Sequence, residues 1–216
     1  MILKSLLDLD IYGPSLPIAL DLFDQPKMTP EKKLIPLEKY GLQVMSFGFI
    51  SGNKTPVIWR GPLVSRMTEQ FFMDVEWGSL DFLILDLPPG TGDIQLSIIE
   101  ILPLRGALIV TTPQDIALID AHKALSMFET LQVKVLGVVE NMADYVCPSC
   151  GHREGVFGQA SYQEFVEQRR VESIAKIPLQ MSIRQGADQG SPASLKSGSS
   201  EAKIFEQLAE EVNKRL

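Results

Sequence analysis

The chain has 216 residues, of which 45% are hydrophobic and 22% are charged, and this composition is that of an ordinary soluble globular protein. Its formal net charge of −7 at pH 7 argues against a general nucleic-acid binder, because contacts with phosphates need a basic face. No apolar stretch approaches the roughly 18 residues of a membrane span, and the N-terminus, MILKSLLDLD, reaches acids too early for a signal peptide. We therefore expect a single large domain, a cytoplasmic location, and neither nucleic-acid nor membrane binding.

Short apolar runs alternate with segments of helical spacing along the chain. The predicted strands are residues 3–9, 42–49, 81–87, 106–112, 133–139 and 174–177. The predicted helices are residues 64–75, 94–102, 116–131 and 162–168, followed by a C-terminal helix whose apolar stripe is Ile204, Leu208 and Val212. Strands that are apolar on both faces and separated by helices predict an α/β fold with a doubly wound, mostly parallel sheet. The Gly/Ser-rich stretch 186–200 is predicted to be a surface loop.

Polar side chains follow the predicted strands at their carboxyl ends, where ligands bind in an open α/β sheet. Asp8 and Asp10 end the first strand in LLDLDIYGPS, Asp86 ends the third in DLPPGTGD, and Asn141 follows the fifth in VVENM. Asp8 and Asp86 are suited to hold Mg²⁺, mostly through water molecules, and Asp10 is suited to orient an attacking water. Taken singly, each of these acids also fits a solvated carboxylate at a strand end.

The second chemical signal is CPSCG, in which two residues separate Cys147 from Cys150. Pro148 and Gly151 shape a turn that can point both sulfur atoms at one metal, but tetrahedral iron–sulfur or zinc sites usually use four ligands. A symmetric homodimer in which each subunit gives two thiolates would complete the shell. His152 could add a third ligand, although a surface position beside the turn fits it better. The alternative is a redox CxxC of the thioredoxin type, which is disfavoured because no helical pattern begins at Cys147.

Six stretches occur together and in a fixed order along the chain. They are LLDLDIYGPS, TPVIWRGPLVS, LDFLILDLPPGTGDIQLS, GALIVTTPQDIALIDAHKALSMF, VLGVVENMADYVCPSCG and IPLQMSIRQGADQGSP. In this order they resemble the Mrp/ApbC family, MinD-like P-loop ATPases that carry or assemble iron–sulfur clusters. The resemblance covers nearly the whole chain from Leu6 onward, and it implies a P-loop NTPase fold of the MinD/SIMIBI type.

The resemblance implies roles for the residues that match the family's motifs. It gives Asp86 a Walker B-type role and places Asp8 and Asp10 at the first switch, with Asp10 closest to hydrolysis. Asn141 matches the residue that reads the adenine edge, and the segment after Pro178 would close that pocket. ATP and Mg²⁺ are the implied nucleotide and metal.

The resemblance also implies the cargo and the partners. It favours a [4Fe–4S] cluster that bridges two chains through Cys147 and Cys150. Iron–sulfur apoproteins and the assembly machinery are the implied partners, beside a second copy of the chain.

One part of the family pattern is absent from these residues. A Gly-rich phosphate loop ending in Gly-Lys-Ser/Thr should precede Asp8 by a strand, a loop and a helix, about 30 residues in all. Only seven residues precede it, and GFISGNKT is not that loop, since Asn53 stands where the second Gly belongs and Pro56 follows at once. We therefore expect a fold without its first strand, phosphate loop and first helix, and so with a gap at the centre of its sheet. A truncated gene product is favoured over an ATPase remnant as the explanation.

Two other functions stay open on the sequence. One is a MinD/ParA-like positioning ATPase, which is disfavoured because the C-terminal stretch EQLAEEVNKRL is of mixed charge and is neither basic nor amphipathic in a way that suggests membrane or DNA. The other is a metal-binding protein without ATPase activity, which the missing phosphate loop keeps open.

Overall fold

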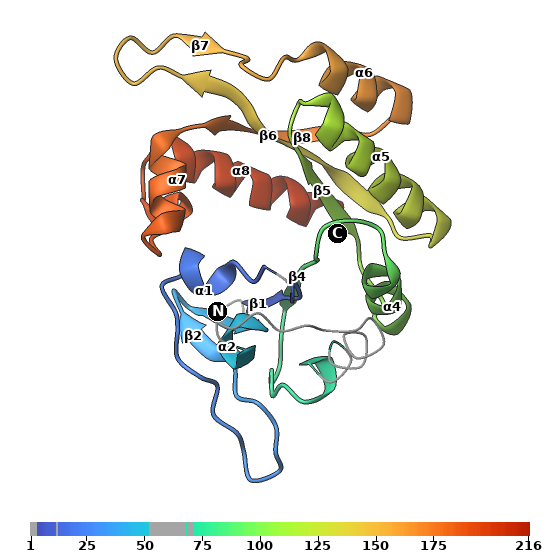
Figure 1. Cartoon of the computed structure of the whole chain (residues 1–216), viewed down its shortest axis with the longest axis vertical. Helices are drawn as coiled ribbons and strands as arrows, with labels where there is room; N and C mark the ends of the chain where they lie inside the picture. The colour runs from blue at the N-terminus through green and yellow to red at the C-terminus, as the bar shows by residue number, and fades with distance from the viewer. Residues whose placement is uncertain (1–3, 12, 52–67, 69–70) are drawn as a thin grey trace. The chain divides into compact units, whose positions relative to one another are not determined.

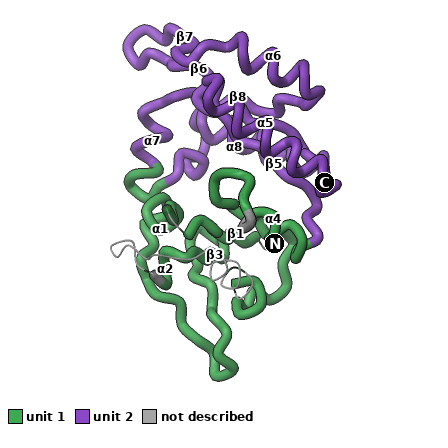
Figure 2. The backbone as a smooth tube through the Cα atoms, turned by 45° about the vertical axis from the view of Figure 1, so that its right-hand side comes forward, with its two compact units in different colours: residues 1–102, 187–191 green, residues 103–186, 192–216 purple. Residues whose placement is uncertain are grey.

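A computed structural model of the chain describes residues 4–11, 13–51, 68 and 71–216. It divides into two compact units, which Figure 2 distinguishes by colour. Unit 1 comprises Met1–Leu102 with Ala187–Ser191, and unit 2 comprises Pro103–Gly186 with Pro192–Leu216. Each unit has its own four-stranded sheet, so each is described by itself.

The sheet of unit 1 has the strand order β2-β3-β1-β4 (Figure 1). Its central strand β1 (Lys4–Asp8) runs parallel to β3 (Leu42–Ser46) on one side and to β4 (Phe82–Asp86) on the other. The short strand β2 (Leu37–Lys39) pairs antiparallel with β3. The helices of this unit include α1 (Leu16–Ala19), α2 (Gly48–Ser51) and α4 (Asp93–Ile101).

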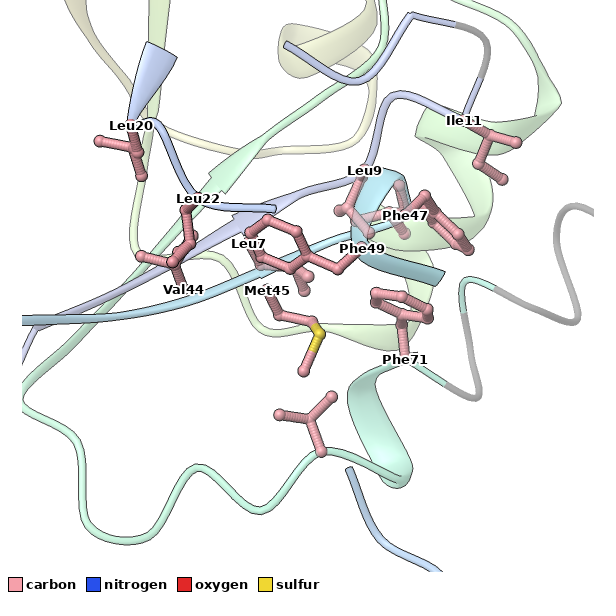
Figure 3. Packing of buried hydrophobic residues seen from close by; sticks show 12 residues of the cluster. Leu7, Leu9, Ile11, Leu20, Leu22, Val44, Met45, Phe47, Phe49 and Phe71 are labelled. Carbon is pink, nitrogen blue, oxygen red and sulfur yellow. The ribbon is translucent and has the colours of Figure 1, made fainter. Parts of the chain in front are cut away.

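The core of unit 1 forms around β1 and β3. Leu7, Val44 and Met45 are fully buried there, as expected for strands whose sequence is apolar on both faces. Beside them Phe47 stacks on Phe71 with ring centroids 4.0 Å apart (Figure 3). This packing holds the carboxyl ends of the two strands in a fixed position.

The sheet of unit 2 is built around one long strand, β6 (Val135–Val146). It pairs in parallel with β5 (Ala107–Thr111) and β8 (Ser173–Leu179), and antiparallel with β7 (Arg153–Glu154). Figure 1 shows the hairpin of β6 and β7 projecting from this sheet as an arm. The helices that begin in this unit are α5 (Asp115–Thr130), which packs on β5, α6 (Ala160–Arg169), α7 (Met181–Asp188), the 3-10 turn η1 (Ala193–Leu195) and α8 (Ser200–Arg215), which packs on β8.

The predicted α/β class with mostly parallel strands is confirmed, and every predicted strand has a counterpart. The C-terminal helix begins as its sequence indicates, because the Ser199 hydroxyl accepts a hydrogen bond from the amide of Ala202 at 3.0 Å. The predicted helix 64–75 lies partly outside the described residues, and Thr68 and residues 71–73 are helical.

Three predicted boundaries are wrong. The second predicted strand ends at Ser46 and not at residue 49, because residues 48–51 turn into the helix α2. The fifth predicted strand does not end at residue 139 but continues to Val146, because β7 and β8 provide hydrogen-bonding partners that local sequence does not reveal. Asn141 therefore lies within this strand and not after it. The stretch 186–200, predicted as a loop, contains the end of α7 and the turn η1. Gly186 is tolerated inside α7, where glycine costs about 1 kcal/mol relative to alanine.

Strands β4 and β5 each have one strand neighbour among the described residues, so the strands form two sheets where one was expected. Among the residues that the structure describes, no helix is both long enough and apolar enough to cross a membrane.

Candidate functional site

The three predicted acids come together at the carboxyl edge of the sheet of unit 1. Asp8 and Asp86 are register partners at the ends of β1 and β4. The Asp10 amide donates to Asp8 Oδ1 at 3.0 Å, so the chain folds back around this carboxylate as it leaves the strand. Asp10 in turn accepts from the amide of Gly13 through Oδ1 at 3.1 Å. The edge therefore presents a concentrated negative charge.

Asp8 is held by a residue that the sequence analysis did not single out. Ser46 is fully buried at the end of β3, and its hydroxyl donates to Asp8 Oδ2 at 2.9 Å. The same hydroxyl accepts from the amide of Gly48 at 3.0 Å, which fixes its orientation. The predicted strand 42–49 placed Ser46 in its interior, so the pattern that identified the acids, a polar residue at the carboxyl end of a strand, did not point to Ser46.

The loop after Asp86 is also pinned by an unpredicted side chain. Gln95 of α4 is buried, and its Nε2 donates to the carbonyls of Pro88 at 2.8 Å and Pro89 at 3.0 Å. Gly90 follows with φ of 97°, a conformation that favours glycine. The loop therefore has a defined path although it lies between a strand and a helix.

Burial raises the pKa of the Asp8 carboxyl above its usual range, against the hydrogen bonds that Asp8 accepts. The pKa of Asp86 is raised as well, first by desolvation and then by the charges of Asp8 and Asp10. Asp86 keeps an exposed side whereas Asp8 is 1% exposed, so burial acts more strongly on Asp8. A nearby cation would offset the charge of two such carboxylates. Their hard oxygen atoms are ligands of the kind that Mg²⁺ prefers.

The raised pKa predicts that removing one charge stabilises the protein at neutral pH. At a pH well below the ordinary pKa of 3.8, both carboxyls are protonated in the folded and in the unfolded chain, so their burial does not lower the free energy of unfolding at that pH. As pH rises above that value the unfolded chain ionises first, and the folded state becomes relatively less stable. We expect Asp86→Asn to raise Tm at pH 7 by about 1–3 °C, a gain reduced by solvent screening at this exposed residue.

This difference should disappear near pH 3.5, as thermal unfolding followed by circular dichroism would show. The matched control is Asp24→Asn, which removes an exposed acid of the same unit. A lower Tm for Asp86→Asn at pH 7 would contradict the prediction.

Asn141 and Pro178 lie together at an irregularity between β6 and β8 in unit 2. Asn141 pairs with Ile177 and Tyr145 pairs with Leu179, so β6 bulges opposite Pro178. Pro178 has no amide hydrogen for the ladder, which accounts for the break. Within the bulge Met142 has φ of 54°, and its amide donates to Asn141 Oδ1 at 3.0 Å. The two residues predicted to contact adenine are thus neighbours, on adjacent strands.

Cys147 and Cys150 are free thiols in the turn that closes the β6–β7 hairpin. The Cys147 amide donates to the carbonyl of His152 at 2.9 Å, and the Gly151 amide donates to the carbonyl of Cys147 at the same distance. Gly151 has φ of 71°, which explains the glycine at this position. Turn residues and not a helix follow Cys147, so the expectation that no helix begins there is confirmed.

The electrostatics of the turn favour a thiolate at Cys147. Backbone N–H groups of Cys150 and Ser149, in that order, lower the pKa of Cys147, and the Cys150 thiol adds to the effect. Thiolates are the ligands that iron and zinc select. Within the described ranges, no three side chains of His, Cys, Asp or Glu form a metal-binding group, and two thiolates are half of the four ligands of a tetrahedral site.

Comparison with known proteins now decides the family. A sequence profile described as ParA: NUBPL iron-transfer P-loop NTPase matches residues 3–213. The chain belongs to this family. The membership that the order of motifs predicted is thus confirmed.

Two relatives illustrate the match to the iron-transfer P-loop NTPases. The mouse iron-sulfur cluster transfer protein NUBPL is 43% identical over 212 residues, which cover 98% of this chain and 66% of the mouse protein. The iron-sulfur cluster carrier protein of Pseudomonas fragi is 44% identical over 207 residues, covering 94% of this chain and 72% of that protein. The chain therefore spans about two thirds of the length of such relatives.

Solved structures confirm the P-loop NTPase fold. A nucleotide-binding protein of Archaeoglobus fulgidus, solved in complex with ADP, superposes with a TM-score of 0.76 at 33% identity, covering 94% of this chain and 79% of that one. The cell division ATPase MinD of Pyrococcus furiosus gives a TM-score of 0.68 at 22% identity, with 99% and 86% covered. The likeness to MinD shows a shared fold alone.

Proposed function

We propose that this chain is an iron–sulfur cluster carrier that binds its cargo through Cys147 and Cys150 and passes it to apoproteins. The observation that carries the proposal is the cysteine turn. It presents two free thiols at the end of a projecting hairpin, with backbone N–H groups that stabilise a thiolate. The relatives whose names describe iron–sulfur transfer support the same cargo.

The half-complete ligand set supports a homodimer with a shared cluster. Two thiolates from each chain make the four that a [4Fe–4S] cluster takes. A two-fold axis through the cluster would pair identical hairpins, as isologous interfaces do. Cys150 is exposed, which leaves an approach for an acceptor's thiolate. Delivery is then a ligand exchange, in which one iron–sulfur bond forms for each one that breaks.

We also propose that the acids of unit 1 serve ATP. Asp8 and Asp86 would hold Mg²⁺, and Asp10 would orient the attacking water. That Asn141 and Pro178 contact the adenine stays a prediction from the family motifs. The metal supplies charge neutralisation for the phosphates, which these carboxylates otherwise repel. Support comes from the way Ser46 and Gln95 fix the surroundings of the acids, and from the family's description as P-loop NTPases.

Anaerobic reconstitution tests the cargo. Purified chain is incubated with iron and sulfide, and its mass is measured by native mass spectrometry. We expect one [4Fe–4S] cluster for two chains, with dimer forming only in the loaded sample, since a ligand bound by the dimer alone stabilises the dimer. The loaded dimer is then mixed with an apo iron–sulfur enzyme, whose recovered activity reports transfer.

Two outcomes would overturn the proposal. One is a monomer that carries a complete cluster, which contradicts the shared site. The other is a chain that takes up no iron and forms an internal Cys147–Cys150 disulfide, which is the behaviour of a redox CxxC.

A further inference from the structure

An ion pair braces the hairpin that carries the cysteines. Arg153 of β7 contacts Asp144 of β6 through both ends of its guanidinium group: Nε lies 2.7 Å from Oδ2 and Nη2 lies 3.1 Å from Oδ1. The Asp144 side chain is 19% exposed, so one partner of the pair is largely shielded from water. A bidentate pair of this kind fixes orientation as well as distance.

The pair flanks the cysteine turn, since Asp144 lies three residues before Cys147 and Arg153 lies three residues after Cys150. Arg153 is the register partner of Val146, and its guanidinium group reaches Asp144, two residues earlier on β6. The pair is therefore a diagonal cross-strand contact directly beneath the turn of Cys147 and Cys150. Any change in the angle between β6 and β7 at this point would move both thiols.

The rest of the hairpin stem offers little to hold that angle. β7 has two residues, and they make the two register pairs Tyr145 with Glu154 and Val146 with Arg153. On its other side, β6 has just passed through the bulge between Asn141 and Tyr145, where the ladder to β8 is irregular. Asp144 lies inside that bulge, so its bond to Arg153 ties the irregular segment to the strand that returns from the turn.

We propose that Asp144 and Arg153 are positioning residues for the cluster site, acting by holding the two thiols in the geometry that binds the cluster. This inference rests on the proposed function, since it assigns the pair a role in that same site. Neither side chain is needed as a ligand. Residues that orient the ligands of a metal site typically change its metal affinity by about 10–100-fold when they are removed.

The test compares Arg153→Gln, Asp144→Asn and the double variant with the unaltered chain. Each is reconstituted anaerobically, and the rate of cluster loss to a chelator is followed by absorbance. We expect each single variant to lose its cluster about tenfold faster. The double variant should lose it no faster than either single one, because the two residues act as one unit. Arg169→Gln, which breaks the Arg169–Glu129 ion pair elsewhere in unit 2, is the matched control and should not change the rate.

A second measurement does not need the cluster. Hydrogen exchange of the peptide that contains Cys147 and Gly151 reports whether their two turn hydrogen bonds open more often. We expect faster exchange in the ion-pair variants Arg153→Gln and Asp144→Asn, and no change in the control Arg169→Gln.

The outcomes separate this inference from the proposed function. If the unaltered chain binds no cluster, the proposed function fails, whatever the exchange data show. If the unaltered chain binds a cluster, and Arg153→Gln and Asp144→Asn keep both its cluster lifetime and its exchange rate, the positioning role is wrong. The positioning role is also wrong if the effects of the two single substitutions on the rate of cluster loss add in the double variant, because additive effects mean that the two residues act independently.

Discussion

Cys147→Ala and Cys150→Ala should each lower the cluster content of the reconstituted protein by about tenfold or more. In a shared site each substitution removes two thiolates, because both chains of the dimer lose the same ligand. Two remaining thiolates leave the iron atoms with an incomplete shell. The dimer should disappear with the cluster, since the cluster is what favours association. Iron and sulfide analysis together with native mass spectrometry measure both effects.

His152→Ala is the matched control for these variants. His152 contributes its backbone carbonyl to the turn. Its exposed side chain takes no part in the turn's hydrogen bonds among the residues that the structure describes. Alanine retains that carbonyl, so cluster content should equal that of the unaltered chain. A loss in His152→Ala as large as in the cysteine variants would show a third ligand and contradict the two-thiolate site.

The second large effect concerns the nucleotide. These 216 residues contain no Gly-rich loop ending in Gly-Lys-Ser/Thr, and such a loop supplies most of the donors that bind phosphate. The sheet edge presents Asp8, Asp10 and Asp86 instead, which repel a triphosphate unless a metal lies between. We expect the 216-residue chain to bind ATP only at millimolar concentration, as isothermal titration calorimetry would show, and to hydrolyse it negligibly.

Fusing the corresponding N-terminal segment of a bacterial relative ahead of Met1 should tighten ATP binding by about a hundredfold or more, because oxyanion donors are restored. Asp10→Asn in this fusion should then lower kcat by about a hundredfold while KM changes little. Asp24→Asn, at an exposed acid of the same unit, should leave both unchanged. Micromolar ATP affinity in the chain without the fusion would contradict the expectation that Asp8, Asp10 and Asp86 alone cannot bind the triphosphate tightly.

Local sequence determined much of this protein. Apolar runs located six of the strands but not β2 and β7, which are only three and two residues long. Period-3.6 patterns located α4, α5, α6 and α8, because burial on one face leaves a signal within a few residues. The acids Asp8, Asp10 and Asp86 were found because several of them follow strands at the carboxyl edge, where ligands bind in an open α/β sheet. The cysteine pair was found by spacing alone, since a turn brings residues 147 and 150 together whatever the rest of the chain does.

Long-range contacts decided the rest. The partition of strands into two sheets, the extension of β6 to Val146 and the bulge opposite Pro178 depend on which strands become neighbours. The same is true of the support around the sites. Ser46 reaches Asp8 across 38 residues of sequence, and Arg153 reaches Asp144 only because β7 returns along β6. The sequence by itself therefore determined which groups could perform the chemistry, whereas only the tertiary structure decided what holds them, because hydrogen bonds between distant strands leave no periodic trace in the chain.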